Sequence, residues 1–83
     1  MPSIENVEMT PAQCRAARAL LNMTQPALGS AASLSLSTVV DFERERRAVS
    51  QAAIAAIRAA LEAAGVVFLS ENGNGPGVAL RRP

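Results

Sequence analysis

Four Ser or Thr residues in the first two thirds of the chain each stand directly before a segment that can form a helix. A hydroxyl at such a position accepts a hydrogen bond from a backbone N–H group that the first helical turn leaves unpaired. The four residues are Thr10, Thr24, Ser35 and Ser50. With Gly65 as a stop signal, they predict helices over about residues 11–22, 25–32, 36–44 and 51–64. The predicted fold class is therefore mainly α.

The end of the chain has a different character. Residues 66–69 are a short apolar run of β type, residues 71–77 are turn residues, and residues 78–81 are a second candidate strand. Two strands alone are marginal in water, so this hairpin needs support from the last helix or from its copy in a second subunit. We therefore divide the chain into a loose lead-in (1–9), a helical domain (10–64) and a β tail (65–83).

Composition narrows the function classes. The 83 residues predict one domain, and one cysteine with no histidine excludes an intramolecular disulfide and argues against a zinc site. Cys14 is expected to be a small core residue rather than a reactive thiol. No glycine-rich phosphate loop opens a helix, so we expect no cofactor and no enzyme. There is no 18-residue apolar stretch and no signal-peptide pattern, so we expect no membrane association and a cytoplasmic location.

All the basic side chains are arginines, and three of them gather at the end of the third predicted helix and just beyond it. The net charge is only +1, but Arg44, Arg46 and Arg47 lie within four positions. The planar fork of arginine suits phosphates and guanine edges. A solvated charge run is the plainer interpretation of such a cluster.

Residues 25–43 have the spacing of a helix-turn-helix. Two short helices that cross steeply over a turn of three to four residues need apolar side chains where they pack and a small residue where they touch. Gly29 supplies the small residue, and the apolar ones are Leu28, Leu34, Val39 and Phe42. The pattern also includes Arg18, Thr24-Gln25, residues 34–39 and 42–44. Over about residues 12–64 the chain thus resembles the phage-repressor and Cro-type regulators, also called the xenobiotic-response-element family.

The resemblance implies a compact four- to five-helix, repressor-like domain whose second and third helices bind double-stranded DNA. It places base contacts at Leu36, Ser37 and Asp41. It places phosphate contacts at Gln25, Thr38, Arg44, Arg46 and Arg47. It also implies a buried ion pair between Arg18 and Glu43, for which the alternative is two unrelated surface charges. Leu36 could instead pack inward or be merely exposed.

Two positions depart from the family pattern. Gly29 stands where alanine is usual, and Ser33 stands where glycine is usual. Glycine inside a helix costs roughly 1 kcal/mol relative to alanine. Ser33 has to accept a left-handed backbone that glycine adopts freely. Both departures predict a less rigid pair of helices.

The implied function is a sequence-specific transcriptional regulator that binds a palindromic operator, which requires a homodimer. The expected interface is the last helix and the β tail, with Ile57, Leu61, Val66, Phe68, Val78 and Leu80. These residues could instead complete the core of one chain, and the strands could pair within one chain or between two. The alternative function is a protein-interaction module of the same fold (an antiactivator or an antitoxin) with a protein partner, which the low net charge and Asp41 favour.

Overall fold

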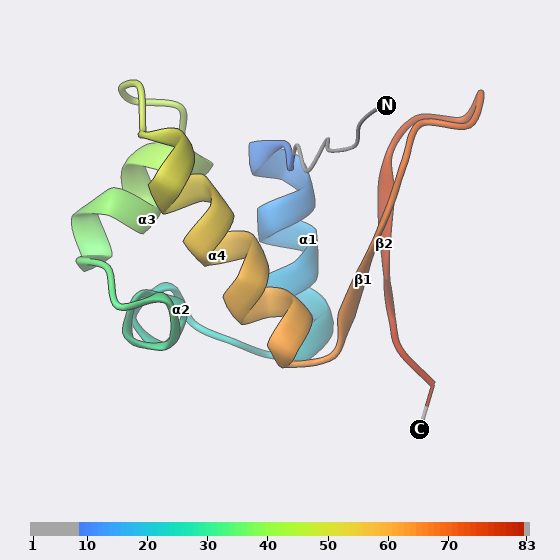
Figure 1. Cartoon of the computed structure of the whole chain (residues 1–83), viewed down its shortest axis with the longest axis horizontal. Helices are drawn as coiled ribbons and strands as arrows, with labels where there is room; N and C mark the ends of the chain where they lie inside the picture. The colour runs from blue at the N-terminus through green and yellow to red at the C-terminus, as the bar shows by residue number, and fades with distance from the viewer. Residues whose placement is uncertain (1–8, 83) are drawn as a thin grey trace.

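The computed structural model describes residues 9–82, in which four helices are followed by one antiparallel hairpin (Figure 1). The elements are α1 (Pro11–Leu21), α2 (Gln25–Ala32), α3 (Leu36–Glu43), α4 (Gln51–Ala63), β1 (Val66–Leu69) and β2 (Gly77–Leu80). The predicted mainly α fold with a C-terminal strand pair is confirmed, and three of the helices end one residue earlier than predicted. No helix in this part of the chain is both long and apolar enough to cross a membrane.

All four predicted cap residues stand at helix starts. The hydroxyls of Thr10, Thr24, Ser35 and Ser50 each accept a hydrogen bond from the backbone N–H three residues further along. At α1 the cap is reciprocal, because the Thr10 N–H also donates to Gln13 Oε1 at 2.9 Å. Thr10 and Gln13 have the three-residue spacing of a capping box, a further sequence signal for the start of α1.

The core lies between the helices and is closed by the first strand. Its fully buried large side chains include Leu28, Val39, Ile57, Leu61 and Val66. Met9 also packs into this core and is buried. The predicted loose lead-in is therefore wrong at residue 9, and residues 1–8 lie outside the described part. An apolar side chain is more stable under the helices than in water, which explains the inward position of Met9.

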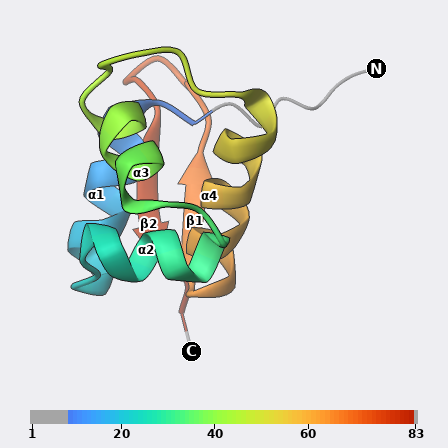
Figure 2. The ribbon, with the colours of Figure 1, turned by 90° about the vertical axis from the view of Figure 1, so that its left-hand side faces the viewer.

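The hairpin lies on the side of the molecule opposite α2 and α3 (Figures 1 and 2). Val66 pairs with Leu80 and Leu69 pairs with Gly77, so the two strands pair within one chain. β2 packs beside α1, and β1 packs against both α1 and α4. Gln13 ties the hairpin to α1, because its Nε2 donates to the carbonyl oxygen of Gly77 at 3.0 Å. The helices thus provide the support that an isolated hairpin lacks.

The burial of the last helix and of the first strand corrects part of the expected dimer interface. Ile57, Leu61 and Val66 are fully buried in the core of their own chain. They complete that core and lie beneath any surface that a second copy could contact. Phe68 and Val78 are partly buried and pack against the same core. Leu80 alone of the six expected residues is exposed.

Candidate nucleic-acid interface

α2 and α3 are joined by a very short connection. Ser33 caps α2 with φ of 59°, the left-handed backbone expected of it. The Leu34 N–H then donates to the Gly29 carbonyl oxygen at 2.8 Å. A Cβ atom on Gly29 would lie 3.0 Å from the Leu34 carbonyl oxygen. The connection can therefore be this tight because residue 29 has no side chain.

The first turn of α3 presents side chains to solvent. Leu36 is 47% exposed, so it does not pack inward. The Ser35 hydroxyl lies 3.1 Å from the Ser37 hydroxyl and 2.9 Å from the Thr38 hydroxyl. The opposite side of α3 is buried through Val39, Phe42 and Glu43. Leu36 and the hydroxyls of Ser35, Ser37 and Thr38 thus lie together at the start of a helix whose opposite side is buried.

Asp41 and Arg47, which were both predicted to contact DNA, form an ion pair with each other. Arg47 Nε lies 2.6 Å from Asp41 Oδ2, and the Asp41 side chain is 16% exposed. The Asp41 carboxylate, expected to accept from a base, therefore has an arginine partner in the free protein. Arg44 and Arg46 are exposed beyond the end of α3. The chain turns between them at Glu45, whose φ is 55°.

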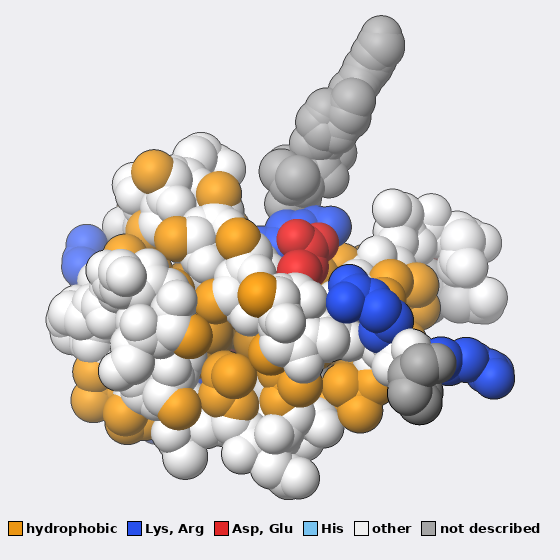
Figure 3. All heavy atoms as spheres, turned by 60° about the horizontal axis from the view of Figure 1, so that its bottom comes forward, with side chains coloured by type: hydrophobic (Ala, Val, Ile, Leu, Met, Phe, Trp, Pro, Cys, Tyr) orange, Lys and Arg blue, Asp and Glu red, His pale blue; other side chains and the backbone are white. Residues whose placement is uncertain are grey.

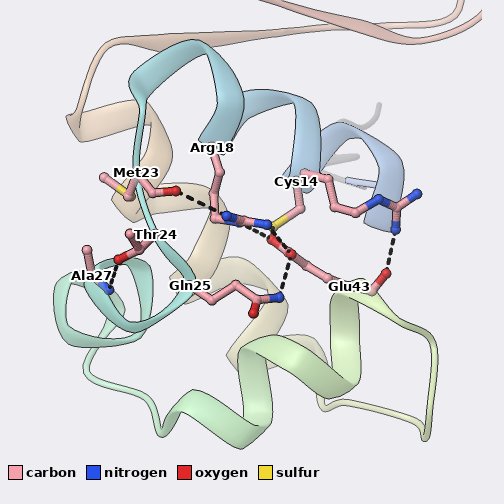
Figure 4. Close-up of polar contacts among 8 residues, drawn as sticks. Cys14, Arg18, Met23, Thr24, Gln25, Ala27 and Glu43 are labelled. Carbon is pink, nitrogen blue, oxygen red and sulfur yellow. Dashed lines mark hydrogen bonds and ion pairs between the residues drawn. The ribbon is translucent and has the colours of Figure 1, made fainter.

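Glu43, the last residue of α3, is the centre of a buried polar network (Figure 4). Arg18 contacts both carboxylate oxygens, with Nε 2.7 Å from Oε2 and Nη2 2.8 Å from Oε1. Cys14 Sγ donates to Oε2 at 3.1 Å, and Gln25 Nε2 donates to Oε1 at 2.9 Å. The Glu43 side chain is 1% exposed. The residues that contact it come from α1 and α2, so one side chain of α3 fixes three helices together.

The expected ion pair between Arg18 and Glu43 is thus present. The side chain of Gln25 does not point outward, where it was expected to contact a phosphate. Its amide donates to the Glu43 carboxylate instead. A buried carboxylate is stabilised by hydrogen bonds from neighbouring donors, which is the physical reason for this difference. Sequence reasoning missed Cys14 and Arg15, which also contact Glu43, Arg15 through the Glu43 carbonyl oxygen. The four-residue spacing of Cys14 and Arg18 on one helix face was the available signal.

The network determines which groups are charged at neutral pH. Burial opposes ionisation of Glu43, but hydrogen bonds from Arg18, Cys14 and Gln25 outweigh it and hold the pKa of this carboxyl below its usual value. Burial raises the pKa of the Cys14 thiol, and its hydrogen bond to the Glu43 carboxylate raises it further. The hydrogen bonds to Glu43 raise the pKa of Arg18. Glu43 is therefore an anion beside a neutral thiol and a guanidinium cation.

The chain matches no protein-family model, and no curated protein is significantly similar to it in sequence. Within residues 9–82, no group of three His, Cys, Asp or Glu side chains is placed to hold a metal ion.

Proposed function

We propose that the chain is a sequence-specific regulator that binds double-stranded DNA as a homodimer on a palindromic site. In this proposal α2 and α3 are a repressor-like helix-turn-helix, and α3 enters the major groove. The observation that carries it is the contrast between the two ends of α3. The first turn is exposed and carries Leu36 and Ser37, whereas Glu43 at the last turn is buried and bound to α1 and α2.

This contrast suits base reading. Recognition helices contact base edges with their N-terminal residues. Leu36 offers methyl groups for a thymine methyl, and the Ser37 hydroxyl can donate to a base or accept from one. The Glu43 network at the other end fixes the angle at which α3 projects. Leu36 is 47% exposed, so its side chain is available for such a contact.

The arginines beyond α3 supply the electrostatic part of the proposal. Arg44 and Arg46 are exposed and follow the reading helix, where the DNA backbone would pass. Arg47 can exchange Asp41 for a phosphate, and the released carboxylate of Asp41 can then accept from a cytosine amino group. The hydroxyl of Thr38 can donate a hydrogen bond to a phosphate. Since the side chain of Gln25 is held by Glu43, we assign its phosphate contact to its backbone N–H at the start of α2.

A protein-interaction module remains the second candidate function. The Asp41–Arg47 pair favours it, because this pair neutralises one arginine on the surface that would face DNA. Salt dependence separates the two functions. DNA binding through several arginines weakens steeply as salt rises, by counterion release. A complex formed through apolar side chains does not.

The test is a selection from a randomised pool of double-stranded DNA, followed by titration of the selected site by fluorescence anisotropy at 50 and 200 mM salt. We expect an enriched palindromic sequence whose affinity falls by at least about tenfold between the two salt concentrations. Failure to enrich any sequence over random DNA would contradict the proposal and favour a protein partner.

A further inference from the structure

We propose that a second copy of the chain docks along the free edge of β2, so that two hairpins join into one four-stranded antiparallel sheet. This inference deepens the homodimer of the proposed function by assigning its contact surface. It uses residues on the side of the molecule away from α3 (Figure 1). Dimer formation can therefore be measured without DNA.

The hydrogen-bond pattern shows which backbone groups of β2 are unpaired. The Arg81 N–H donates to the Gly65 carbonyl oxygen at 2.7 Å. In an antiparallel ladder the hydrogen-bonded pairs alternate, so the next ones are Val67 with Ala79 and Leu69 with Gly77. The N–H and C=O groups of Val78 and Leu80 then point away from β1. No residue of the described part hydrogen-bonds to them.

The two strands have different neighbours. β1 packs against α4 as well as α1, and the guanidinium of Arg58 on α4 lies 4.7 Å from the centre of the Phe68 ring. The edge of β2 instead borders a groove beside α1. Ala12, Ala16, Gly77 and Val78 are among the residues that line this groove. An unpaired strand edge beside an apolar groove is the arrangement that binds another extended strand.

The register of a twofold pair follows from the unpaired groups. If Val78 pairs with Leu80 of the second copy, the two residues exchange both of their backbone hydrogen bonds. By symmetry, Leu80 makes the same pair with Val78 of the second copy. The twofold axis then passes beside Ala79. Pro76 would be the next residue to donate, and it has no N–H, so the pairing ends there. In this register the exposed Leu80 of each copy enters the groove beside Val78 of the other.

Charge and exposed apolar surface favour a second copy as the occupant. The same register brings Arg82 of one chain opposite Pro76 of the other, next to Gly75, whose N–H donates to the Glu71 carboxylate. At each end of the symmetric pair, Arg82 of one chain thus lies near Glu71 in the hairpin turn of the other. The exposed large apolar residues outside α3 are Leu20, Val67, Leu69 and Leu80, all on α1 or the hairpin. Figure 3 shows hydrophobic side chains, with basic ones at their margin, over the end of the molecule where the chain terminates.

Sedimentation of the full chain without DNA tests the pairing, with two matched leucine variants. Leu80 and Leu36 are 48% and 47% exposed. We expect the wild type to be a dimer and Leu80→Pro to raise the dimer dissociation constant by at least about tenfold. The outward N–H that proline removes has no partner within the chain, so the hairpin itself should persist by circular dichroism. Leu36→Ser should remain as dimeric as the wild type and lose DNA affinity.

A cross-link tests the register. Opposed residues of a non-hydrogen-bonded pair have Cα atoms about 4.5 Å apart, within the range of a disulfide. Ala79→Cys should therefore give a covalent dimer on oxidation, whereas Val67→Cys, on the same sheet face but the other strand, should not. A wild-type monomer, a dimer unaffected by Leu80→Pro, or equal cross-linking of the two cysteine variants would each overturn the proposal. Dimerisation without DNA binding would leave it standing and refute only the proposed function.

Discussion

The guanidinium of Arg18 binds both carboxylate oxygens of Glu43, across 25 residues of sequence. A bidentate pair of this kind fixes orientation as well as distance. It joins the last turn of α1 to the last residue of α3, and Gln25 adds the first residue of α2 to the same carboxylate. The direction in which α3 projects therefore depends on one buried side chain.

Replacing Glu43 by glutamine should destabilise the fold strongly. The amide cannot neutralise Arg18, and breaking one partner of a buried pair costs about 3–5 kcal/mol. Urea unfolding followed by circular dichroism measures the loss. The matched control is Glu62→Gln, which removes an ion pair to Arg58 on the surface of α4 and should cost under about 0.5 kcal/mol. Equal effects of the two variants would contradict the central role of Glu43.

Stability should fall in acid because of the same carboxyl. The folded-state pKa of Glu43 lies below the usual value of 4.5. The unfolded chain therefore binds the proton first as the pH falls, so this contribution is complete above pH 4.5 and is lost as the pH falls through the folded-state pKa. Urea unfolding from pH 7 to pH 3 should show this loss. Glu43→Gln should show a flatter profile, and an unchanged slope would contradict the assignment.

The thiol of Cys14 should be inert in the native state. It is fully buried, and its raised pKa keeps it protonated beside the Glu43 carboxylate. Since the thiolate is the reactive form, a thiol reagent at pH 8 should modify the native chain at least about a hundredfold more slowly than the chain in 8 M urea. Comparable rates in the two conditions would show that Cys14 is accessible.

The close approach at Gly29 should tolerate no branched side chain. Gly29→Val would place atoms against the Leu34 carbonyl oxygen and should cost about 1–3 kcal/mol by overpacking. Ala31→Val, at an exposed position of the same helix, should cost less than about 1 kcal/mol, from helix propensity alone. Thermal unfolding of the two variants makes the comparison. A smaller loss for the Gly29 variant would contradict the tight connection between α2 and α3.

The parts of the fold that depend on neighbouring residues could be predicted from the sequence. The four hydroxyl caps placed every helix start. The left-handed backbone of Ser33 was expected from the family resemblance, because the family usually has glycine at this position. Contacts between distant residues were harder to infer. The Arg18–Glu43 pair came only through a family resemblance. The spacing of Cys14 and Arg18 places both on one helix face, but nothing local indicates that Gln25 shares the same carboxylate.

The tail shows a different limit of sequence reasoning. An apolar helix stripe or strand has the same pattern whether it covers its own core or a partner's. Ile57, Leu61 and Val66 were therefore assigned to a dimer interface although they are buried within one chain. The ion pair between Asp41 and Arg47 was missed for a related reason, because each residue was considered against DNA alone. Both errors arise where a surface has two physically reasonable partners.

The most direct test of the central claim compares Ser37→Ala and Arg44→Ala on a selected DNA site and its single-base variants, by anisotropy titration at two salt concentrations. The proposed roles predict that Ser37→Ala relaxes preference at one base position, by about 0.5–1.5 kcal/mol, the contribution of one neutral hydrogen bond. Arg44→Ala should weaken all sequences alike and reduce the salt slope by about one. Variants that bind every sequence as the wild type does would contradict DNA reading by α3.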